Sequence, residues 1–436
     1  MKYVKPEIDL LYGIEEKPRS NRDMIVYAMQ WVMILFYPVV WGYSIVGLGL
    51  EFTDAELAGY MTQVIFIIGV STLMQVLAGH KLAMISGPNI IPSLAIVAAY
   101  SVAGKEYALQ SFNAFIIAGV LVTFLGFTGI ISQISKFWTP LVSGSMIMMI
   151  GITASTTAGS LLAAGSSPFN LIIGIALALI CGYLSIKGKG ILASIPVLIT
   201  ILLGYLVFIA IGEFNWDIVH AMPALTFPKI FPYGLQMPPL DLVVIMCIVN
   251  LFSAINLYGN MDGYSRIVGA KLEKQDEKRT FTIFGIVEST IASIFGVPGN
   301  VAYGENLGLI ILTKVASKWF MIVASAIFIG LSFFGKIGGL MAAMPQVVAG
   351  AILLGVASTL IGIGASNWIN LPEFKTREIF IVGFSIFLAY GLSTLSETYY
   401  ATLPRLVGTI LKNPVITVIF FTVILEQIIF RKETKV

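Results

Sequence analysis

The chain has 436 residues, of which 57% are hydrophobic and only 11% are charged, with a formal net charge of +3. A soluble domain is about one quarter charged, so this composition excludes a soluble protein and predicts a polytopic protein in a lipid bilayer. The apolar runs are unbroken over about 20 residues, as in membrane-spanning helices, whereas the strands of a membrane barrel alternate over about 10. The small net charge gives no indication of nucleic-acid binding.

Cysteine and histidine are too scarce and too scattered to form a metal site or a disulfide framework. Cys181 and Cys247 lie in separate apolar runs, and His80 and His220 are isolated near the ends of runs. We therefore expect neither a metal ion nor a cofactor. His80 precedes Lys81 in a predicted cytoplasmic turn, and we interpret it as a solvated loop residue.

The apolar runs, breakers and charges predict an all-α protein with about fourteen membrane segments. In chain order they cover residues 24–50, 57–79, 82–102, 110–134, 140–156, 168–186, 191–212, 241–263, 280–297, 300–314, 318–335, 346–364, 378–395 and 407–430. Residues 1–23 mix basic with acidic side chains and are not followed by a small-residue cleavage site. We expect this stretch to be a cytoplasmic leader rather than a removable signal peptide.

The distribution of Lys and Arg predicts the orientation, because these residues collect in cytoplasmic loops. With both termini in the cytoplasm, the basic residues expected outside are few: Lys105, Lys229, Lys336, Arg405 and Lys412. A polar loop at residues 213–239 separates segments 1–7 from segments 8–14. Since seven is odd, the halves have opposite orientations, as in many secondary transporters. The sequence thus predicts a multi-pass protein of the cytoplasmic membrane with a 7+7 inverted repeat.

The third segment of each half is interrupted by glycine and proline, at residues 84–94 and 296–314. After each break about 12 residues remain, or about 18 Å of helix, which is too short for a hydrocarbon core of about 30 Å. Each segment should enter extended and continue as a half-helix whose free N–H groups face its counterpart. Paired interruptions of this kind indicate a midplane binding site. Glu305, at the start of the second half-helix, adds an acceptor for N–H groups of a ligand ring.

Other polar residues fall within predicted segments. For Gln30, a hydrogen bond to a neighbouring helix and a place in the site are equally open. Asn256 lies in the segment adjacent by repeat symmetry and is favoured as a site residue. Glu288 is costly to bury unpaired, and roles in ion coupling and in structure are both open. Asp262 is expected to cap its helix or pair with the nearby Arg266.

Four features carry a family resemblance. The stretch Glu305-Asn-Leu-Gly-Leu-Ile-Ile-Leu-Thr-Lys314 has the pattern Gln or Glu, Asn, any residue, Gly, four residues, Thr and a basic residue. Residues 11–18 read Leu-Tyr-Gly-Ile-Glu-Glu-Lys-Pro, and residues 29–36 read Met-Gln-Trp-Val-Met-Ile-Leu-Phe, with Trp31 where His is usual. Fourteen segments with breaks in the third and tenth complete the set. Together these features resemble the nucleobase-ascorbate transporter family, or nucleobase:cation symporter-2, which includes uracil and xanthine permeases.

The resemblance implies a core domain (residues 24–137 and 240–336) that moves against a gate domain (138–212 and 337–430), usually within a homodimer. The extracytoplasmic loop 213–239 would join the halves, and residues 431–436 would form a cytoplasmic tail. It further implies that Glu305 hydrogen-bonds a nucleobase and that backbone N–H groups near the two breaks bind its carbonyls. The candidate substrate-binding residues are Glu305, Gly304, Asn256, Asn89, Ile90, Gln30, Tyr303 and Asn306, and the candidates for proton coupling are Glu305 and Glu288.

One departure from the family pattern lies in segment 8, where uracil and xanthine permeases carry a glutamate. Aligning the glycine that follows it with Gly259 puts Asn256 at this position. The Asn256 amide both donates and accepts, so it can still pair with the edge of a base, but it cannot titrate.

The sequence therefore predicts a secondary transporter and not an enzyme. The specific hypothesis is cation-coupled symport of a nucleobase, either uracil or a xanthine-type purine, by alternating access. The proton is the expected coupling ion, and Na⁺ is the alternative to it. Two further transport functions stay open, an anion carrier of the sulfate type and a passive nucleobase facilitator. An intramembrane enzyme would need a nucleophile and base or metal ligands within the spans, and the two His and two Cys are badly placed for either.

Overall fold

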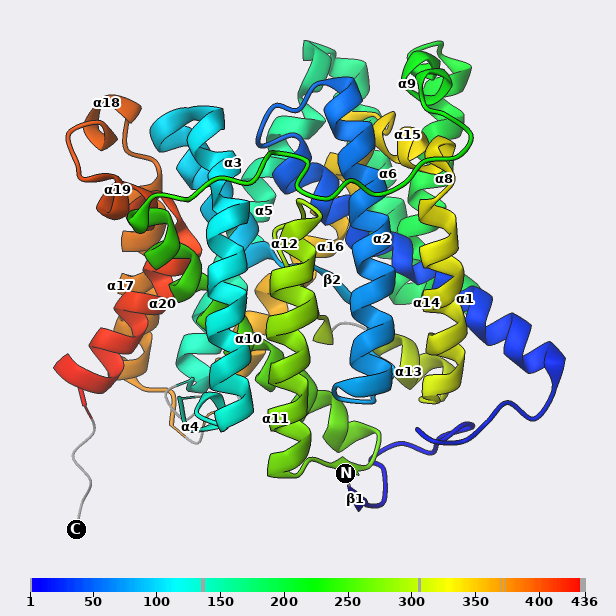
Figure 1. The fold of residues 1–436 in the computed structure, drawn as a ribbon, viewed down its shortest axis with the longest axis horizontal. Coiled ribbons are helices and arrows are strands. Elements are labelled where there is room, and N and C mark those ends of the chain that lie inside the picture. Colours follow the sequence, from blue (N-terminus) through cyan, green and yellow to red (C-terminus); the bar gives the residue numbers. More distant parts are fainter. Residues whose placement is uncertain (1, 135–137, 305–306, 370, 372, 432–436) are drawn as a thin grey trace.

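The computed structural model describes residues 2–134, 138–304, 307–369, 371 and 373–431. The protein is built almost entirely of helices that run between two ends of the molecule (Figure 1). Within the described residues, eight helices are long and apolar enough to cross a membrane, or up to nine if a bent pair counts as one span. The chain is therefore an all-helical, multi-pass membrane protein, as its composition predicts.

The helices and strands of the two halves follow each other without a separate soluble domain among the described residues. The first half contains β1 (Lys2–Tyr3), α1 (Asn21–Trp41), η1 (Gly42–Gly47), α2 (Asp54–Ala78), β2 (Ser86–Pro88), α3 (Ile90–Thr128), α4 (Ile131–Ile134), α5 (Pro140–Leu162), η3 (Ala164–Ser166), α6 (Pro168–Lys187), α7 (Ile191–Ser194), α8 (Pro196–Ala210) and α9 (Trp216–Ala221). The second half contains α10 (Leu240–Ile267), β3 (Ala270–Lys271), α11 (Lys274–Ile283), η4 (Phe284–Ile291), α12 (Ala292–Ile294), β4 (Asn300–Ala302), α13 (Leu307–Thr313), α14 (Lys318–Ser332), α15 (Gly335–Ala342), α16 (Gln346–Ile369), α17 (Thr376–Ser393), α18 (Glu397–Tyr400), α19 (Arg405–Lys412), α20 (Pro414–Ile424) and η6 (Leu425–Ile429).

Among the described residues there are fewer long helices than the fourteen segments predicted, because several segments are short, broken or joined. Predicted segments 3 and 4 are both in α3, which changes direction at Gly104, where φ is 84° and glycine has no steric penalty. Segments 7 and 11 correspond to α8 and α14, of 15 residues each. Segment 14 was expected to be one span, whereas α19 and the helix that follows it meet at 90°. Asn413 and Pro414 lie at this bend, where Asn413 caps the new helix.

Local sequence signals explain where the main helices begin. Thr53 and Glu56 form a reciprocal capping box at the start of α2, which satisfies two free N–H groups of the first turn. Pro140 and Pro168 stand in the first turns of α5 and α6, where a missing N–H costs nothing. Asn89 caps α3 through its side chain, so the half-helix predicted after the first break begins at Ile90.

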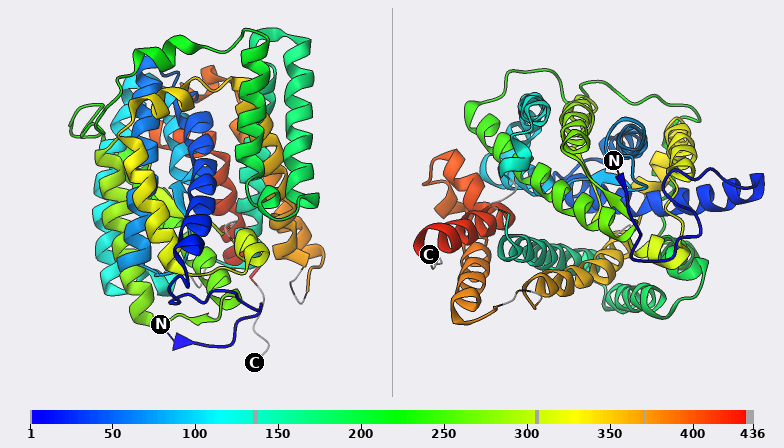
Figure 2. Two further views of the ribbon diagram at one scale, coloured as in Figure 1. Left: turned by 90° about the vertical axis from the view of Figure 1, so that its right-hand side faces the viewer. Right: turned by 90° about the horizontal axis from the view of Figure 1, so that it is seen from below.

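The helices pack as two groups. In one group α2 packs against α14 and α15, and α3 packs against α10, α11 and η4. In the other, α5 and α6 pack against α16, and α17 packs against α20. Seen from below, α5 and α16 lie side by side, across the molecule from the row formed by α2, α3 and α11 (Figure 2). Tyr43 Oη, in η1, donates to the carbonyl of Met344, directly before α16 of the second group, at 2.5 Å.

The two interrupted segments meet in the middle of the molecule. Strands β2 and β4 pair antiparallel, with Ser86 opposite Ala302 and Pro88 opposite Asn300, and α3 and α13 follow them. The expectation that each broken segment enters extended and continues as a helix is confirmed for the described residues. Gly87 is needed at this crossing, because a Cβ there would lie 2.4 Å from Pro38 Cβ.

The leader, residues 2–20, is folded onto the second half of the chain. Strand β1 pairs with β3, and the Leu11 and Tyr12 amides donate to the Lys314 carbonyl at 2.7 and 3.2 Å. The Tyr12 ring is 2% exposed and packs edge-on against Phe320. The leader therefore fixes the chain directly after α13.

Two expectations at the ends of the predicted segments have different outcomes. The expected ion pair between Asp262 and Arg266 is confirmed. The interpretation of His80 as a solvated loop residue is wrong, because its side chain is 0% exposed and its Nδ1 accepts a hydrogen bond from the Leu82 amide at 3.0 Å. Burial, and to a lesser extent the charge of Arg279, lowers the pKa of His80 to about 3.

Candidate functional site

A cavity of about 280 Å³ lies where the two broken segments meet the second group of helices. This volume is near the lower end of small-molecule sites, about 300 Å³. One wall is made by the start of α3, by β4 and by one face of α10; the other is made by α5 and α16. Its lining comprises Asn89, Ile90, Ile91, Met146, Ile147, Ile150, Asn256, Gly259, Asn260, Gly263, Tyr264, Val301, Tyr303, Gly304, Leu307, Leu360 and Ile363.

Asn89 lies directly before the first half-helix, as its N-cap. Its backbone amide donates to the Gly299 carbonyl at 3.0 Å, and its side-chain Oδ1 accepts from the Ile91 amide at 3.1 Å. The residue is 1% exposed, and its Nδ2 has no hydrogen-bond partner among the described residues. A buried donor without a partner is costly, so this amide is suited to a ligand that supplies an acceptor.

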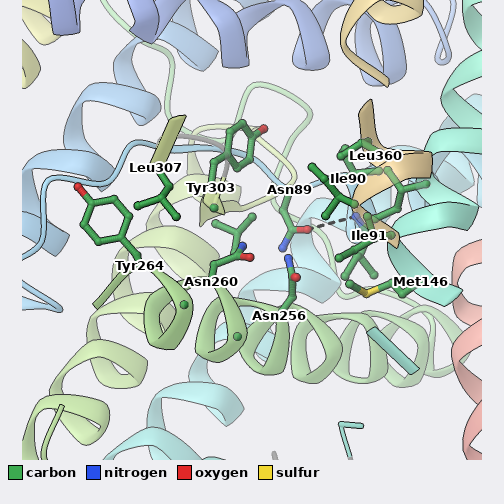
Figure 3. Close-up of a pocket in the computed structure, with 17 residues that line it drawn as sticks. Asn89, Ile90, Ile91, Met146, Asn256, Asn260, Tyr264, Tyr303, Leu307 and Leu360 are labelled. Atoms are coloured by element: carbon green, nitrogen blue, oxygen red, sulfur yellow. Dashed lines mark hydrogen bonds between the residues drawn. The ribbon is translucent and has the colours of Figure 1, made fainter. Parts of the chain in front are cut away.

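Helix α10 presents two asparagines to the cavity. Asn256 and Asn260 are four residues apart, so they lie on one face of the helix. Asn260 Nδ2 donates to the Ala302 carbonyl of β4 at 2.9 Å. Asn256 makes no hydrogen bond to a described residue, and its amide points across the cavity toward that of Asn89 (Figure 3). The lining of this wall therefore combines apolar side chains with amides.

The second broken segment contributes Tyr303 and Gly304. Tyr303 Oη donates to the Pro88 carbonyl at 2.6 Å, which ties the two broken segments together. At Gly304 an added Cβ would lie 3.0 Å from Asn260 Oδ1, so a side chain there would crowd the amide. Two further candidates from the sequence, Glu305 and Asn306, lie outside the described residues.

The remaining sequence candidates are placed differently. Gln30 does not line the cavity: its Nε2 donates to Ser194 Oγ at 2.9 Å, and Ser194 borders a second hollow of about 230 Å³. This outcome corresponds to the helix-to-helix hydrogen bond that the sequence left open. Residues on α13 line both spaces, with Leu307 on the first and Leu309 on the second.

Glu288 is buried behind the crossing of the broken segments. It is 0% exposed and accepts a hydrogen bond from Gln75 Nε2 at 2.6 Å. Its backbone carbonyl would lie 3.1 Å from a Cβ on Gly299, directly before β4. The residue belongs to η4, a π-helical stretch, and such irregular turns within helices are frequent at functional sites.

The structure brings together five of the residues predicted for the site, Asn89, Ile90, Asn256, Tyr303 and Gly304. Asn260 was not included, although its spacing from Asn256 puts both on one face of a helix and could have indicated it. The wall formed by α5 and α16, including Met146 and Leu360, carries no signal in the sequence because its lining residues are ordinary apolar ones. Within the described residues, no group of three or more His, Cys, Asp or Glu side chains is placed to hold a metal ion.

Comparison with known proteins identifies the family. A family model for xanthine and uracil permeases, described as a permease family, matches residues 22–398. The chain belongs to this permease family. The resemblance seen in the sequence is therefore confirmed, as is the prediction of a transport protein rather than an enzyme.

Individual permeases are similar over most of the chain. A putative purine permease of Clostridium perfringens is 24% identical over 98% of this chain and 95% of its own. The xanthine permease of Bacillus subtilis is 24% identical over 94% of both chains, and the uracil permease of Bacillus caldolyticus is 27% identical over 72% of this chain and 76% of its own.

Solved structures share the fold of this permease at low sequence identity. The transmembrane domain of the cyanobacterial bicarbonate transporter BicA is similar with a TM-score of 0.58 and 14% identity, covering 89% of this chain and 96% of that one. The murine Slc26a9 anion transporter in its inward-facing state has a TM-score of 0.58 and 11% identity, covering 92% and 68%. At these identities the likeness describes the fold alone.

Proposed function

We propose that this permease is a proton-coupled nucleobase symporter of the cytoplasmic membrane that works by alternating access, as a homodimer with both termini in the cytoplasm. The observation that carries the proposal is the cavity at the crossing of β2 and β4, lined by asparagine amides and apolar side chains. A flat heterocycle with carbonyl and N–H groups matches such a lining, because amides bind its edge and apolar side chains cover its faces. The relatives named as purine, xanthine and uracil permeases support this class of substrate.

The position of the cavity supports alternating access. Core elements, residues 24–137 and 240–336, supply Asn89, Asn256 and Tyr303, and gate elements, residues 138–212 and 337–430, supply Met146 and Leu360. A ligand held mainly by one group and covered by the other changes its exposure when the groups move against each other. The inverted 7+7 arrangement, with residues 213–239 as the outer loop, provides two such states.

Proton coupling is assigned to Glu305 and Glu288. Glu305 precedes α13, where it would accept N–H groups of the base. Glu288 is a buried carboxyl close to the crossing, and a buried charge is costly unless it is paired or neutralised. Protonation of Glu288 would therefore favour the packing around β4 that forms the cavity. By linkage, substrate and proton would then favour each other's binding.

The test measures uptake of radiolabelled uracil, xanthine and hypoxanthine into proteoliposomes under an imposed pH gradient. We expect accumulation above equilibrium in the unmodified protein and none in Glu305→Gln, although that variant still inserts. Normal accumulation in Glu305→Gln would refute its assignment. Glu288→Gln keeps an acceptor for Gln75 but cannot titrate, so we expect exchange of substrate without pH-driven accumulation.

The same assay separates the other functions. Accumulation driven by a sodium gradient and not by a pH gradient would replace the proton by Na⁺. Equilibration without accumulation under either gradient would indicate a passive facilitator. Uptake of sulfate or bicarbonate without uptake of any base would indicate an anion carrier of the same fold.

A further inference from the structure

The central cavity opens toward the end of the molecule that carries the leader. Along α10 its lining continues to Gly259 and Gly263, which are exposed, and on α16 it includes Ile363, which is 40% exposed. Helix α10 ends at Ile267, directly before β3, which pairs with the leader strand β1. In the orientation proposed above this end is cytoplasmic, so the structure corresponds to an inward-open state.

At the opposite end, helix α19 bridges the two groups of helices. It packs against α3 and α10 of the first group, which also contains α2, α11, α14, α15 and η4, and against α17 and α20 of the second, which also contains α5, α6 and α16. Figure 1 shows α18 and α19 at the end of the molecule opposite to the leader. The approach to α3 is close, because a Cβ on Gly408 would lie 3.6 Å from Val102 Cγ1.

The bend between α19 and α20 is fixed by hydrogen bonds, although the two helices meet at 90°. Asn413 Oδ1 accepts from two amides in the first turn of α20, at 3.0 and 3.1 Å. Thr417 Oγ1 reaches back across the bend and donates to the Ile410 carbonyl of α19 at 2.8 Å. Pro414 further restricts the backbone at this point. Helix α19 should therefore move together with α20 and the second group.

One charged contact holds α19 against the first group. The Arg405 guanidinium lies over the ring of Tyr107 on α3, with Cζ 5.4 Å from the ring centre. Tyr107 Oη donates to Asp241 Oδ2 of α10 at 2.7 Å, and the residue is 6% exposed, so its ring is held in place beneath the cation. A hydroxyl that donates to a carboxylate makes its ring more electron-rich, which strengthens the attraction for the guanidinium.

We propose that Arg405, Tyr107 and Asp241 form a lock on the inward-open state, which has to open whenever the second group moves relative to the outer ends of α3 and α10. Arg405 is not among the residues that line the cavity. It is therefore a positioning residue that acts on the equilibrium between the two states and not on the contacts of the ligand. The inference rests on the alternating access and the orientation proposed above, and it does not depend on which substrate is carried.

The first experiment measures the separation of the two groups by double electron–electron resonance. Spin labels are attached to Ala55→Cys on α2 and Ala401→Cys after α18, both exposed, in the full chain with Cys181 and Cys247 replaced by serine. The protein is reconstituted in liposomes without substrate. We expect Arg405→Gln to raise the ratio of the longer to the shorter distance population about 2–5-fold, the equivalent of one exposed cation–π contact. Arg405→Lys keeps a cation and should restore the ratio of the unmodified protein.

The matched control is Lys412→Gln. Lys412 lies on the same helix with its Nζ 5.0 Å from the centre of the Tyr400 ring, but this contact is with α18, which precedes α19 in the same part of the chain. We expect Lys412→Gln to leave the ratio of the two populations unchanged. An equal shift in both variants, or no shift in Arg405→Gln, would overturn the lock.

The second experiment does not depend on the folding of Arg405→Gln. Gly408→Cys combined with Val102→Cys, in the same background, brings two cysteines within reach of a disulfide between α19 and α3. We expect oxidation to stop uptake of labelled base into proteoliposomes and reduction to restore it, whereas each single variant takes up base under both conditions. Full uptake by the cross-linked protein would overturn the lock. If the unmodified protein takes up no base, the proposed function fails, while the distance measurement still decides whether the lock exists.

Discussion

Burial of His80 makes the stability of this protein depend on pH in a defined direction. The ring takes up a proton near its ordinary pKa of 6.5 in the unfolded chain, whereas burial and the charge of Arg279 lower the pKa to about 3 in the folded protein. The unfolded state therefore binds more protons between these values. The contribution of the neutral ring to stability is complete above pH 6.5 and is lost as the pH falls from 6.5 toward 3.

The size of the effect follows from the two pKa values. Each pKa unit corresponds to about 1.4 kcal/mol, so at pH 5 the protein should be less stable by about 2 kcal/mol than at pH 8 on account of this ring alone. Carboxylates add their own pH dependence. The effect of His80 is therefore measured as the difference between two variants in how their stability changes with pH, and not from the pH dependence of one protein.

Thermal unfolding of the detergent-purified protein, followed by tryptophan fluorescence at pH 8, 6.5 and 5, measures this difference. His80→Asn retains an acceptor for the Leu82 amide but does not titrate, so its stability should fall less between pH 8 and pH 5. His220→Asn is the control, because His220 is exposed. Identical pH dependence in His80→Asn and His220→Asn would refute the reasoning.

Three further changes test packing described above. Tyr12→Ala should weaken docking of the leader by about 3 kcal/mol. The measurement is the rate of proteolytic cleavage near residue 12, which should rise. An unchanged rate would show that Tyr12 does not hold the leader against Phe320. Gly87→Ala should destabilise the protein by about 1–3 kcal/mol through the close contact at the strand crossing, seen as a lower unfolding temperature. The control is Gly391→Ala, where an added Cβ would have no neighbour within 4 Å. We expect the control to leave the unfolding temperature unchanged, and an equal change in both variants would refute the close contact. Tyr43→Phe leaves the buried Met344 carbonyl without its donor and should cost about 1 kcal/mol in the same assay; equal stability would show that this hydrogen bond is not formed in solution.

Local chemistry made the broken segments predictable. Pro88 and Gly87 precede Asn89, a cap residue, and a helix starting at Ile90 follows from those residue types alone. The predicted pairing of an acid with its neighbour four residues along, Asp262 with Arg266, is also local. Such features depend on residues close together in the chain.

Features that depend on distant residues were not predictable in this way. Gln30 bonds Ser194, which lies in another predicted segment, and nothing near residue 30 selects that partner over a ligand. His80 is buried near α11, from which Arg279 Nε donates to the Gly79 carbonyl. Nothing close to residue 80 in the chain indicates this contact. Its polar side chain and its neighbour Lys81 therefore suggested that His80 is exposed. The fixed polarity of Asn89 likewise required the structure, because only the cap shows which side-chain atom faces the cavity.

The docking of the leader has a consequence for biosynthesis. Glu16 and Ser317, which are joined by a hydrogen bond, are separated by 301 residues. At a synthesis rate of 5–20 residues per second, the leader is made roughly 15–60 s before its binding surface. Until then Tyr12 has its local partners Asp23 and Tyr27, but not Phe320. The half-helix α13 is thus fixed at its far end only after Lys314 and Ser317 have been made, so the cavity that Leu307 borders is completed late in synthesis.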